Sequence, residues 1–293
     1  AGKLWLVEGR DMTAQAALLP GGRLHLSHGP IDLVIGAEGA RDVAFRAGFD
    51  RFGTILSELT AELPLLRRPV GTKPNGKIAR AMYRAALPHA DGLTTPMICV
   101  AGAVAAEVLS AMVDAADLTR AYVNNGGDIA LHLTEGARFE VGIAGLDGRS
   151  LGTVTIRSTD PIRGIATSGQ GGRSQSLGIA DSVTVLARSA AMADAAATRL
   201  GNAVDLPAHP AIRRSPANQL HEDSDLGAAP VVTHVGPLSP ADANHALNAG
   251  ATAAQGLRDR GLISAAALFL RDQHTVIGLP ETLKSLTKAP EHA

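Results

Sequence analysis

The stretch over residues 164–202 constrains the fold and the chemistry more than any other part of the chain. It begins with a glycine-rich loop, Ala166-Thr167-Ser168-Gly169 followed by Gln170-Gly171-Gly172, whose backbone N–H groups are able to approach an anion or a planar ligand. The alternation of polar and β-branched residues over 182–187 predicts a short strand with one solvent-exposed face. An alanine-rich helix follows directly, and we expect the chemistry of the protein in this stretch.

The helix over 190–200 has clear termini in the sequence. Ser189 predicts its N-cap, and Gly201 occupies the position of a C′ glycine. Asp194 and Thr198 are four residues apart, so their oxygens share one face of this helix. The opposite face is apolar and consists of Met192, Ala196 and Leu200. A carboxylate and a hydroxyl suit a hard cation such as Mg2+ that also holds a ligand phosphate. The alternative is a solvated surface acid beside a hydroxyl that bonds its own helix.

A second pair of glycines separates two predicted strands over 120–123 and 129–133. The intervening residues are Asn124-Asn125-Gly126-Gly127-Asp128, and Asn-Gly is a strong hairpin signal, so a plain turn accounts for them. The alternative is that the two glycines clear space for a ligand, to which Asn125 and Asp128 form hydrogen bonds. The spacing alone leaves both interpretations open.

Three of these segments resemble motifs of the ApbE superfamily, the flavin transferases that attach FMN to a protein threonine. They are the ATSG loop at 166–169, the SVTV strand at 182–185 and the ADAAAT helical segment at 193–198. The sequence is more similar to the UPF0280 branch of that superfamily, for which no settled activity is implied. Hallmarks of this branch stand at Thr95-Pro96-Met97 with Ala101-Gly102-Ala103, Tyr122 to Asp128, Gly178-Ile179-Ala180-Asp181, and Asp223-Ser224-Asp225-Leu226-Gly227.

The resemblance implies a protein that binds FAD, FMN or a related phosphorylated ligand together with Mg2+. In that arrangement Asp194 and Thr198 hold the metal, and the expected catalytic residues are Asp181, Asp194 and Arg173. The ligand would contact Asn125, Gly126, Gly127, Asp128, Ala166, Thr167, Ser168 and Gly169. The implied reaction is the transfer of FMN from FAD to a protein threonine.

The sequence departs from the flavin transferases between the glycine-rich loop and the following strand. Residues 173–181 replace the histidine-rich strand and the Asp-Pro-x-Thr-Gly segment of those enzymes, and Asp181 either substitutes for part of that segment or caps the next strand. Residues able to stack on a flavin ring are sparse and include Trp5, Tyr83 and Tyr122.

Because of these departures, two alternative functions stay open. One is a metabolic enzyme acting on a small anionic ring compound, with Arg173 as an anion clamp and His221 or His234 as acid–base groups. The other is a non-catalytic flavin- or metabolite-binding protein.

Predicted hairpins outnumber predicted β-α-β units, which favours an α+β protein. Further strands are expected over 4–7, 14–18, 23–27, 31–35, 262–270 and 275–279, with a hairpin over 142–156. Helices are expected over 40–66 with a break near Gly53, over 95–113 with Thr95 as N-cap, and over 240–260. The resemblance implies a single ApbE-like domain over 1–293, in which antiparallel sheets pack against long helices. It has two intimately packed lobes that cross over near 115–165.

Two long connections accompany the expected site. The basic loop over 66–77, rich in proline and glycine, is able to contact a phosphate from the rim, and a solvated connection is the alternative. The segment over 205–225 is too long for a simple connection and favours a lid over the site.

Composition limits the function classes. A net charge of −1 and an aromatic content of 3% argue against a nucleic-acid partner. Cys99 is the single cysteine, which excludes an internal disulfide and a cysteine-based metal cluster, and its apolar surroundings favour a buried thiol. No charged-then-apolar leader and no apolar run of membrane-spanning length stand out, so we expect a cytoplasmic protein without a membrane partner. Its expected partners are a small-molecule ligand and, through the resemblance, a protein acceptor. A homo-oligomer stays open.

Overall fold

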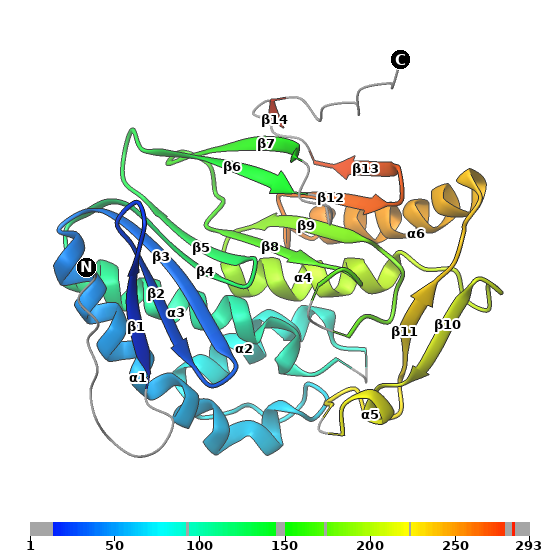
Figure 1. Ribbon diagram of the computed structural model, residues 1–293, viewed down its shortest axis with the longest axis horizontal. Helices are drawn as coiled ribbons and strands as arrows, with labels where there is room; N and C mark the ends of the chain where they lie inside the picture. The colour runs from blue at the N-terminus through cyan, green and yellow to red at the C-terminus, as the bar shows by residue number, and fades with distance from the viewer. Residues whose placement is uncertain are drawn as a thin grey trace.

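A nine-stranded sheet runs through the whole molecule, and every neighbouring pair of its strands is antiparallel (Figure 1). The computed structural model describes residues 14–91, 94–144, 150–172, 175–222, 224–278 and 283–284. In spatial order the strands are β1 (Gln15–Leu19), β2 (Arg23–His28), β3 (Ile31–Gly39), β4 (Leu118–Asn125), β5 (Asp128–Leu133), β8 (Gly164–Ser168), β9 (Ser182–Ala187), β12 (Ala265–Leu270) and β13 (Gln273–Ile277). The strand expected over 4–7 lies outside the described residues.

Two smaller sheets accompany the main one. The first contains β6 (Arg138–Ala144), β7 (Ser150–Arg157) and β14 (Leu283–Lys284), and the second contains β10 (Ile212–Pro216) and β11 (Pro230–Val235). Side chains of β6 and β7 share a hydrophobic cluster with those of β5, β8, β9 and β12, so the β6–β7 hairpin covers one face of the main sheet.

Helices cover the other face of the sheet (Figure 1). They are α1 (Arg41–Leu66), α2 (Lys77–Ala86), α3 (Val100–Ala115), α4 (Ala190–Ala203) and α6 (Pro240–Asp259); α5 (Ala217–Leu220) and the 3-10 turns η1 (Leu87–His89) and η2 (Pro96–Cys99) are short. Helices α1 and α3 pack on β2, β3, β4 and β5, and α4 and α6 pack on β8, β9, β12 and β13. This arrangement confirms the α+β class and the two-lobed organisation, with antiparallel sheets against long helices.

The two lobes meet at a short ladder. Strands β5 and β8 are joined by only two residue pairs, Ile129 with Ile165 and Ala130 with Gly164. By comparison, β3 and β4 pair over seven positions. The β5–β8 ladder, in the middle of the main sheet, therefore has fewer paired residues than the other ladders of that sheet.

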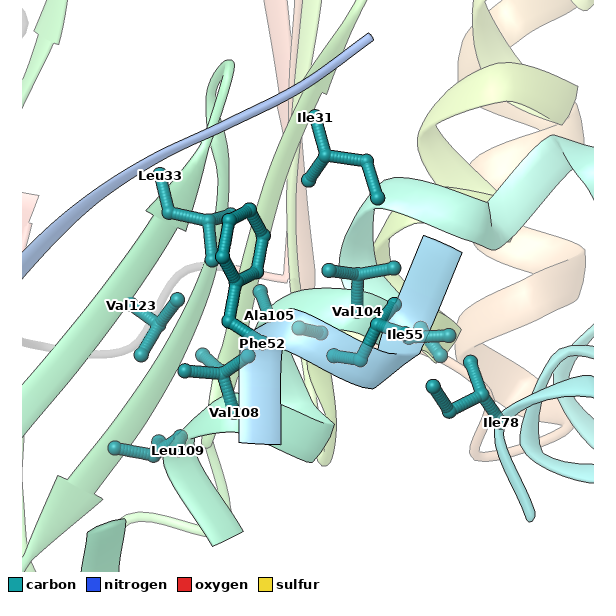
Figure 2. Close-up of a cluster of buried hydrophobic side chains, with 14 of the residues drawn as sticks. Ile31, Leu33, Phe52, Ile55, Ile78, Val104, Ala105, Val108, Leu109 and Val123 are labelled. Atoms are coloured by element: carbon teal, nitrogen blue, oxygen red, sulfur yellow. The ribbon is translucent and has the colours of Figure 1, made fainter. Parts of the chain in front are cut away.

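The core of the first lobe lies between α1, α3 and the strands β2 to β4. Figure 2 shows Phe52 and Ile55 of α1 meeting Val104 and Val108 of α3 and Leu33 of β3. All five side chains are fully buried. Helix α1 continues through the expected break, because Gly53 faces open space on the exposed side, where the absence of a side chain does not interrupt the hydrogen bonds of the helix.

Strand β9 is buried on both faces, so the prediction of one solvent-exposed face is wrong. Val183, Val185 and Ala187 face the helices, whereas Leu186 packs with the β6–β7 side. Thr184 is buried too, and its hydroxyl forms a hydrogen bond of 3.0 Å with that of Thr167. The alternation in the sequence shows the two faces correctly, but the covering hairpin removes the second face from water.

Helix α4 is likewise buried nearly all round, which corrects the prediction of one apolar and one open face. It is enclosed by β8, β9, α2, α3 and α6. The N-cap prediction is confirmed, since the Ser189 hydroxyl accepts a hydrogen bond from Met192 N at 3.3 Å. Gly201 lies inside the last turn, because the helix ends at Ala203.

The segment Pro96–Ala115 has the length and the mean hydropathy, 1.9, of a membrane-spanning helix. That composition corrects the expectation that no such run exists. In the structure the segment is a 3-10 turn followed by α3, which packs against α1, α4, β4 and β5. This is the environment of a buried core helix. Thr95 occupies the N-cap position of the 3-10 turn, as predicted, but its hydroxyl makes no capping bond and donates instead to Asp225 Oδ2 at 2.7 Å.

The segment expected to be a lid contains regular structure instead. It forms β10 and α5, and β11 follows it. Its described residues form hydrogen bonds with residues 175–177: Gln175 Nε2 donates to the Ala217 carbonyl, and Arg214 donates to the Leu177 carbonyl. The described part of 205–225 therefore packs beside the second lobe.

Candidate functional site

A cavity of about 580 Å3 opens where α1, α3, α4 and the β4–β5 hairpin come together. We call it the main cavity. The predicted site residues that line it are Asn125, Gly126, Asp128, Thr167, Ser168, Gly169, Asp194 and Thr198. Residues that are far apart in the sequence thus surround one space, of a size that holds a small molecule.

Asp194 projects from α4 toward the first turn of α3. Its Oδ2 accepts a hydrogen bond from Gly102 N at 2.9 Å, so the carboxylate satisfies one of the N–H groups that a helix leaves unpaired at its start. Asp194 is 8% exposed. Burial and the nearby Asp128 charge raise the pKa of Asp194 well above its usual range, against the N–H groups of Gly102 and Ala101, which lower it. The interpretation as a solvated surface acid is therefore wrong.

Asp128 is the second carboxylate of the cavity and begins β5, immediately after the hairpin turn. Burial raises the pKa of Asp128 to about 7, and a hydrogen bond from the Thr167 N–H opposes this shift. Asp128 and Asp194 therefore face each other as two electrostatically interacting acids, 66 residues apart in sequence. Two like charges at this depth are stable only if one is protonated or a cation lies between them.

The hairpin before Asp128 is both a tight turn and part of the cavity wall. Gly126 and Gly127 have φ angles of 65° and 113°, which glycine adopts without strain. Asn125 Nδ2 donates to the Ala101 carbonyl at 3.2 Å, which ties the hairpin to the start of α3. The motif is therefore a tight turn that also borders the main cavity. Gly127 itself lines a neighbouring hollow of about 340 Å3 with Asn124.

Thr198 lies one turn after Asp194 on α4 and lines the main cavity. Its hydroxyl donates to the Ile98 carbonyl at 3.3 Å, across to η2, and so does not bond its own helix. A hydroxyl that donates one hydrogen bond keeps its lone pairs for a cation. Asp194 and Thr198 therefore present oxygens to the same space, as their spacing predicts.

The glycine-rich segment is more regular than expected. Ala166, Thr167 and Ser168 belong to β8, and Ala166 is fully buried among apolar side chains away from the cavity lining. The N–H groups of the following residues already have partners: Gln170 N donates to Ala180 O at 2.9 Å, and Gly172 N donates to Gly169 O at 3.1 Å. These N–H groups do not form an open cradle, and the segment borders the cavity through Thr167, Ser168, Gly169 and Gly172.

Of the other two predicted catalytic residues the structure describes one, Asp181, and it does not line the main cavity. Asp181 lines the hollow of about 340 Å3, and its carboxylate accepts hydrogen bonds from Arg271 N at 2.5 Å and Gln170 Nε2 at 3.4 Å. The interpretation as a structural acid beside the strand therefore fits its contacts. Arg173 lies outside the described residues.

The long wall of the main cavity comes from α1. Leu56, Leu59 and Leu63 line it together with Val100 and Val104 of α3. The helical spacing of the α1 leucines indicates an apolar face but not that part of this face borders a ligand space. Aromatic rings are absent from the described lining, so the wall is aliphatic.

Arg67 follows the end of α1 and is the single cationic side chain among the described lining residues. It belongs to the basic loop for which a phosphate contact was one interpretation. Leu66, the first residue of that range, also lines the cavity, and the other described residues of the loop do not.

The donor set fits a hard cation that keeps some ligands from a bound molecule. Asp128, Asp194 and Thr198 supply oxygens, and no group of three His, Cys, Asp or Glu side chains able to hold a metal occurs in the part of the chain that the structure describes. Mg2+ is commonly bound by one or two carboxylates together with ligand phosphates, and not by an all-protein cage. The pair of buried acids is the feature that a cation would stabilise.

A family model described as AbpE bacteria matches residues 16–276. The chain belongs to this family. This confirms the family predicted from the sequence motifs. The AbpE-family protein is 47% identical over 121 residues to a UPF0280 protein of Methanothrix thermoacetophila, with 40% of this chain and 49% of the relative covered. It is 39% identical over 129 residues to one of Archaeoglobus fulgidus, with 44% and 51% covered. The chain spans about half the length of the curated relatives it matches.

Two solved structures are similar to the AbpE-family protein at 14% sequence identity. The flavin transferase ApbE from Vibrio cholerae has a TM-score of 0.38, with 68% of this chain and 87% of that chain covered. The apo flavinyl transferase ApbE of Pseudomonas stutzeri has a TM-score of 0.43, with 91% and 94% covered.

Proposed function

We propose that this protein binds a flavin or a related phosphorylated ligand together with Mg2+ in the main cavity, and that it is a flavin-transferase-type enzyme. The observation that carries the proposal is the pair of buried carboxylates, Asp128 and Asp194, beside the hydroxyl of Thr198. Family membership supports the flavin as the ligand class. The reaction proposed is transfer of FMN from FAD to a threonine of an acceptor protein.

Each residue has a distinct role in this proposal. Asp128, Asp194 and Thr198 hold Mg2+, which would neutralise the charge on the ligand's phosphates and align them. Arg67 and the Ser168 hydroxyl contact phosphate oxygens. The leucines of α1 pack on the ring and keep water from the phosphates, in a cavity whose volume suits a ligand of this class.

The structure favours this function over the alternative enzyme. His221 and His234, the acid–base groups of the alternative, are exposed residues near α5 and in β11, and neither lines the main cavity. A non-catalytic flavin binder would use the same cavity and differs only in turnover.

A titration of FAD with and without Mg2+ tests the binding half of the proposal. We expect the absorbance and fluorescence of FAD to change on binding, and the affinity to rise at least about tenfold with Mg2+, because a cation removes the repulsion between two acids and ligand phosphates. Absorbance of the purified protein and mass spectrometry of the denatured supernatant would identify a ligand retained through purification.

Three variants separate the metal site from the fold. Asp128→Asn and Thr198→Val should abolish the effect of Mg2+ and retain weak FAD binding. Asp194→Asn should have the same effect as these two variants, and its amide oxygen can still accept the hydrogen bond from Gly102 N. Asp114→Asn, an exposed acid at the other end of α3, is the matched control. FAD binding indifferent to Mg2+, or an Mg2+ effect that survives in all three site variants, would show that these acids are not a metal site. If FAD binding depended on Mg2+ but no FMN were transferred to threonine-bearing acceptors, the protein would be a non-catalytic flavin-binding protein.

A further inference from the structure

A second cavity, of about 320 Å3, lies between α2, α3 and the first turn of α4. It shares no lining residue with the main cavity. We call it the alanine cavity, because its walls include Ala81, Ala85, Ala103, Ala106 and Ala191. The expected flavin and metal chemistry uses none of its residues.

The sequence explains why this space exists. Ala81 and Ala85 are four residues apart on α2, and Ala103 and Ala106 are three apart on α3, so each pair lies on one helical face. Methyl groups on facing helices leave a gap that larger side chains would fill. The resulting walls are apolar and suit an apolar body of about one ring.

His89 gives this apolar space a polar end. It is 7% exposed and lines the cavity, yet its ring makes no hydrogen bond or ion pair with any residue that the structure describes. Its backbone is held in place, because the Thr94 hydroxyl donates to the His89 carbonyl at 3.0 Å. Among the described residues the buried side-chain nitrogen without a partner is His28 Nδ1, so the His89 ring nitrogens are accessible to a molecule that enters the cavity.

The charges around His89 are positive. Burial, as the larger cause, and the nearby positive charges of Arg199 and Arg260 together lower the pKa of His89 to about 4. Arg199 forms an ion pair with Asp91 at 2.5 Å, and Arg260 donates to the Pro88 carbonyl at 2.7 Å, so both are fixed near the histidine. At neutral pH the ring is uncharged and donates one N–H, in a field that favours an anion.

Two further groups point to the same kind of ligand. Arg84 lines the cavity from α2 and has no hydrogen-bond or ion-pair partner among the described residues. Ser189 and Ala191 bring in the start of α4, a 14-residue helix in which the Ser189 hydroxyl already caps Met192 N and the helix dipole still favours a negative charge.

We propose that the alanine cavity binds a small organic carboxylate. Its apolar body packs on the alanine walls, and its carboxylate meets the His89 ring, the Arg84 guanidinium and the start of α4. This site is independent of the main cavity and of the flavin proposal.

The cavity walls supply their own reporters. Carbon-13 labelling of alanine methyl groups allows a titration with benzoate to be followed by NMR at the five wall alanines, and Ala101 reports on the main cavity. We expect saturable shifts at the wall methyls with little change at Ala101, at concentrations up to about 20 mM, well above a millimolar dissociation constant. Benzyl alcohol, of similar shape but uncharged, should bind at least about tenfold more weakly.

Variants test the two parts of the site separately. Arg84→Gln should weaken benzoate about tenfold, since it removes a charge-assisted hydrogen bond. Arg80→Gln, an exposed charge on the same helix that does not line the cavity, should change nothing. Ala106→Leu should abolish binding by filling the space, with an unchanged methyl spectrum elsewhere showing that the fold is intact.

Three results would overturn the proposal. Equal affinity for benzoate and benzyl alcohol would show an apolar hole without anion preference. Shifts only at Ala101 would place benzoate in the main cavity. If Arg84→Gln bound benzoate as tightly as the unaltered protein does, the carboxylate would not lie at the Arg84 end of the cavity.

Discussion

The two acids of the main cavity should make the stability of the metal-free protein fall as pH rises. Asp128 has a pKa of about 7 in the folded protein, against an ordinary value of 3.8. The folded state therefore binds more protons than the unfolded state between these values, and the free energy of unfolding decreases with pH across this window. With these two pKa values the loss between pH 5 and pH 8 is about 2–3 kcal/mol for Asp128 alone. Burial and the Asp128 charge raise the pKa of Asp194 as well, so its contribution has the same sign.

Urea unfolding at pH 5 and pH 8 in the presence of EDTA measures this loss. Asp128→Asn should remove most of it, because an amide of the same shape carries no charge and still accepts from the Thr167 N–H. At pH 8 the variant should be more stable than the unaltered protein. At pH 8, Mg2+ at one hundred times its dissociation constant should raise the free energy of unfolding of the unaltered protein by about 2.7 kcal/mol. It should not change the free energy of unfolding of the variant.

The reasoning fails if the unaltered protein and Asp128→Asn lose the same free energy between pH 5 and pH 8. It also fails if stability rises with pH over this range, since the sign follows directly from a raised acid pKa. Asp114→Asn serves as the control, because its carboxylate is exposed.

Other positions give sharp expectations for stability, each measured by urea unfolding. Gly102→Ala should destabilise by about 1–3 kcal/mol, because a Cβ there would lie 2.4 Å from Ala190 O; an unaffected variant would mean that α3 and α4 move apart freely. Ser239→Ala should cost about 1 kcal/mol by removing the capping box at the start of α6, and Ser239→Asn should recover most of it. Thr95→Val should cost about 1 kcal/mol through its hydrogen bond to Asp225, and an additive double variant with Asp225→Asn would disprove their coupling.

Local features of the fold were predictable from the sequence. The Ser189 cap and the Ser239 capping box depend on residues three apart, and the Gly126–Gly127 turn depends on two glycines in a row. Each is set by backbone chemistry within a few residues, which spacing in a sequence describes directly. Helix α2 carries no such signal at its start, where Gly76 makes no side-chain cap bond.

Properties that depend on distant segments were not predictable in the same way. The burial of β9 on its second face depends on the β6–β7 hairpin, and the enclosure of α4 depends on α2 and α6. Asp194 and Thr198 share a face by spacing alone, but Asp128 joins them only through the order of the strands. The hydrogen-bonded N–H groups after Gly169 could not be inferred from glycine content, because their partners at 180 and 169 are fixed by how the loop folds back.

The main cavity lies beside the short ladder between β5 and β8, which is the line along which the main sheet has the fewest paired residues. Asp128 stands on one side of that ladder, whereas Ser168 and Asp194 belong to the other lobe. Rotation of one lobe against the other would break few interstrand bonds and would change the separation of the two acids. A molecule that bridges the two acids would therefore hold the lobes together. Filling the cavity should slow amide hydrogen exchange at Ile129 and Ile165 more than in strands far from the β5–β8 ladder.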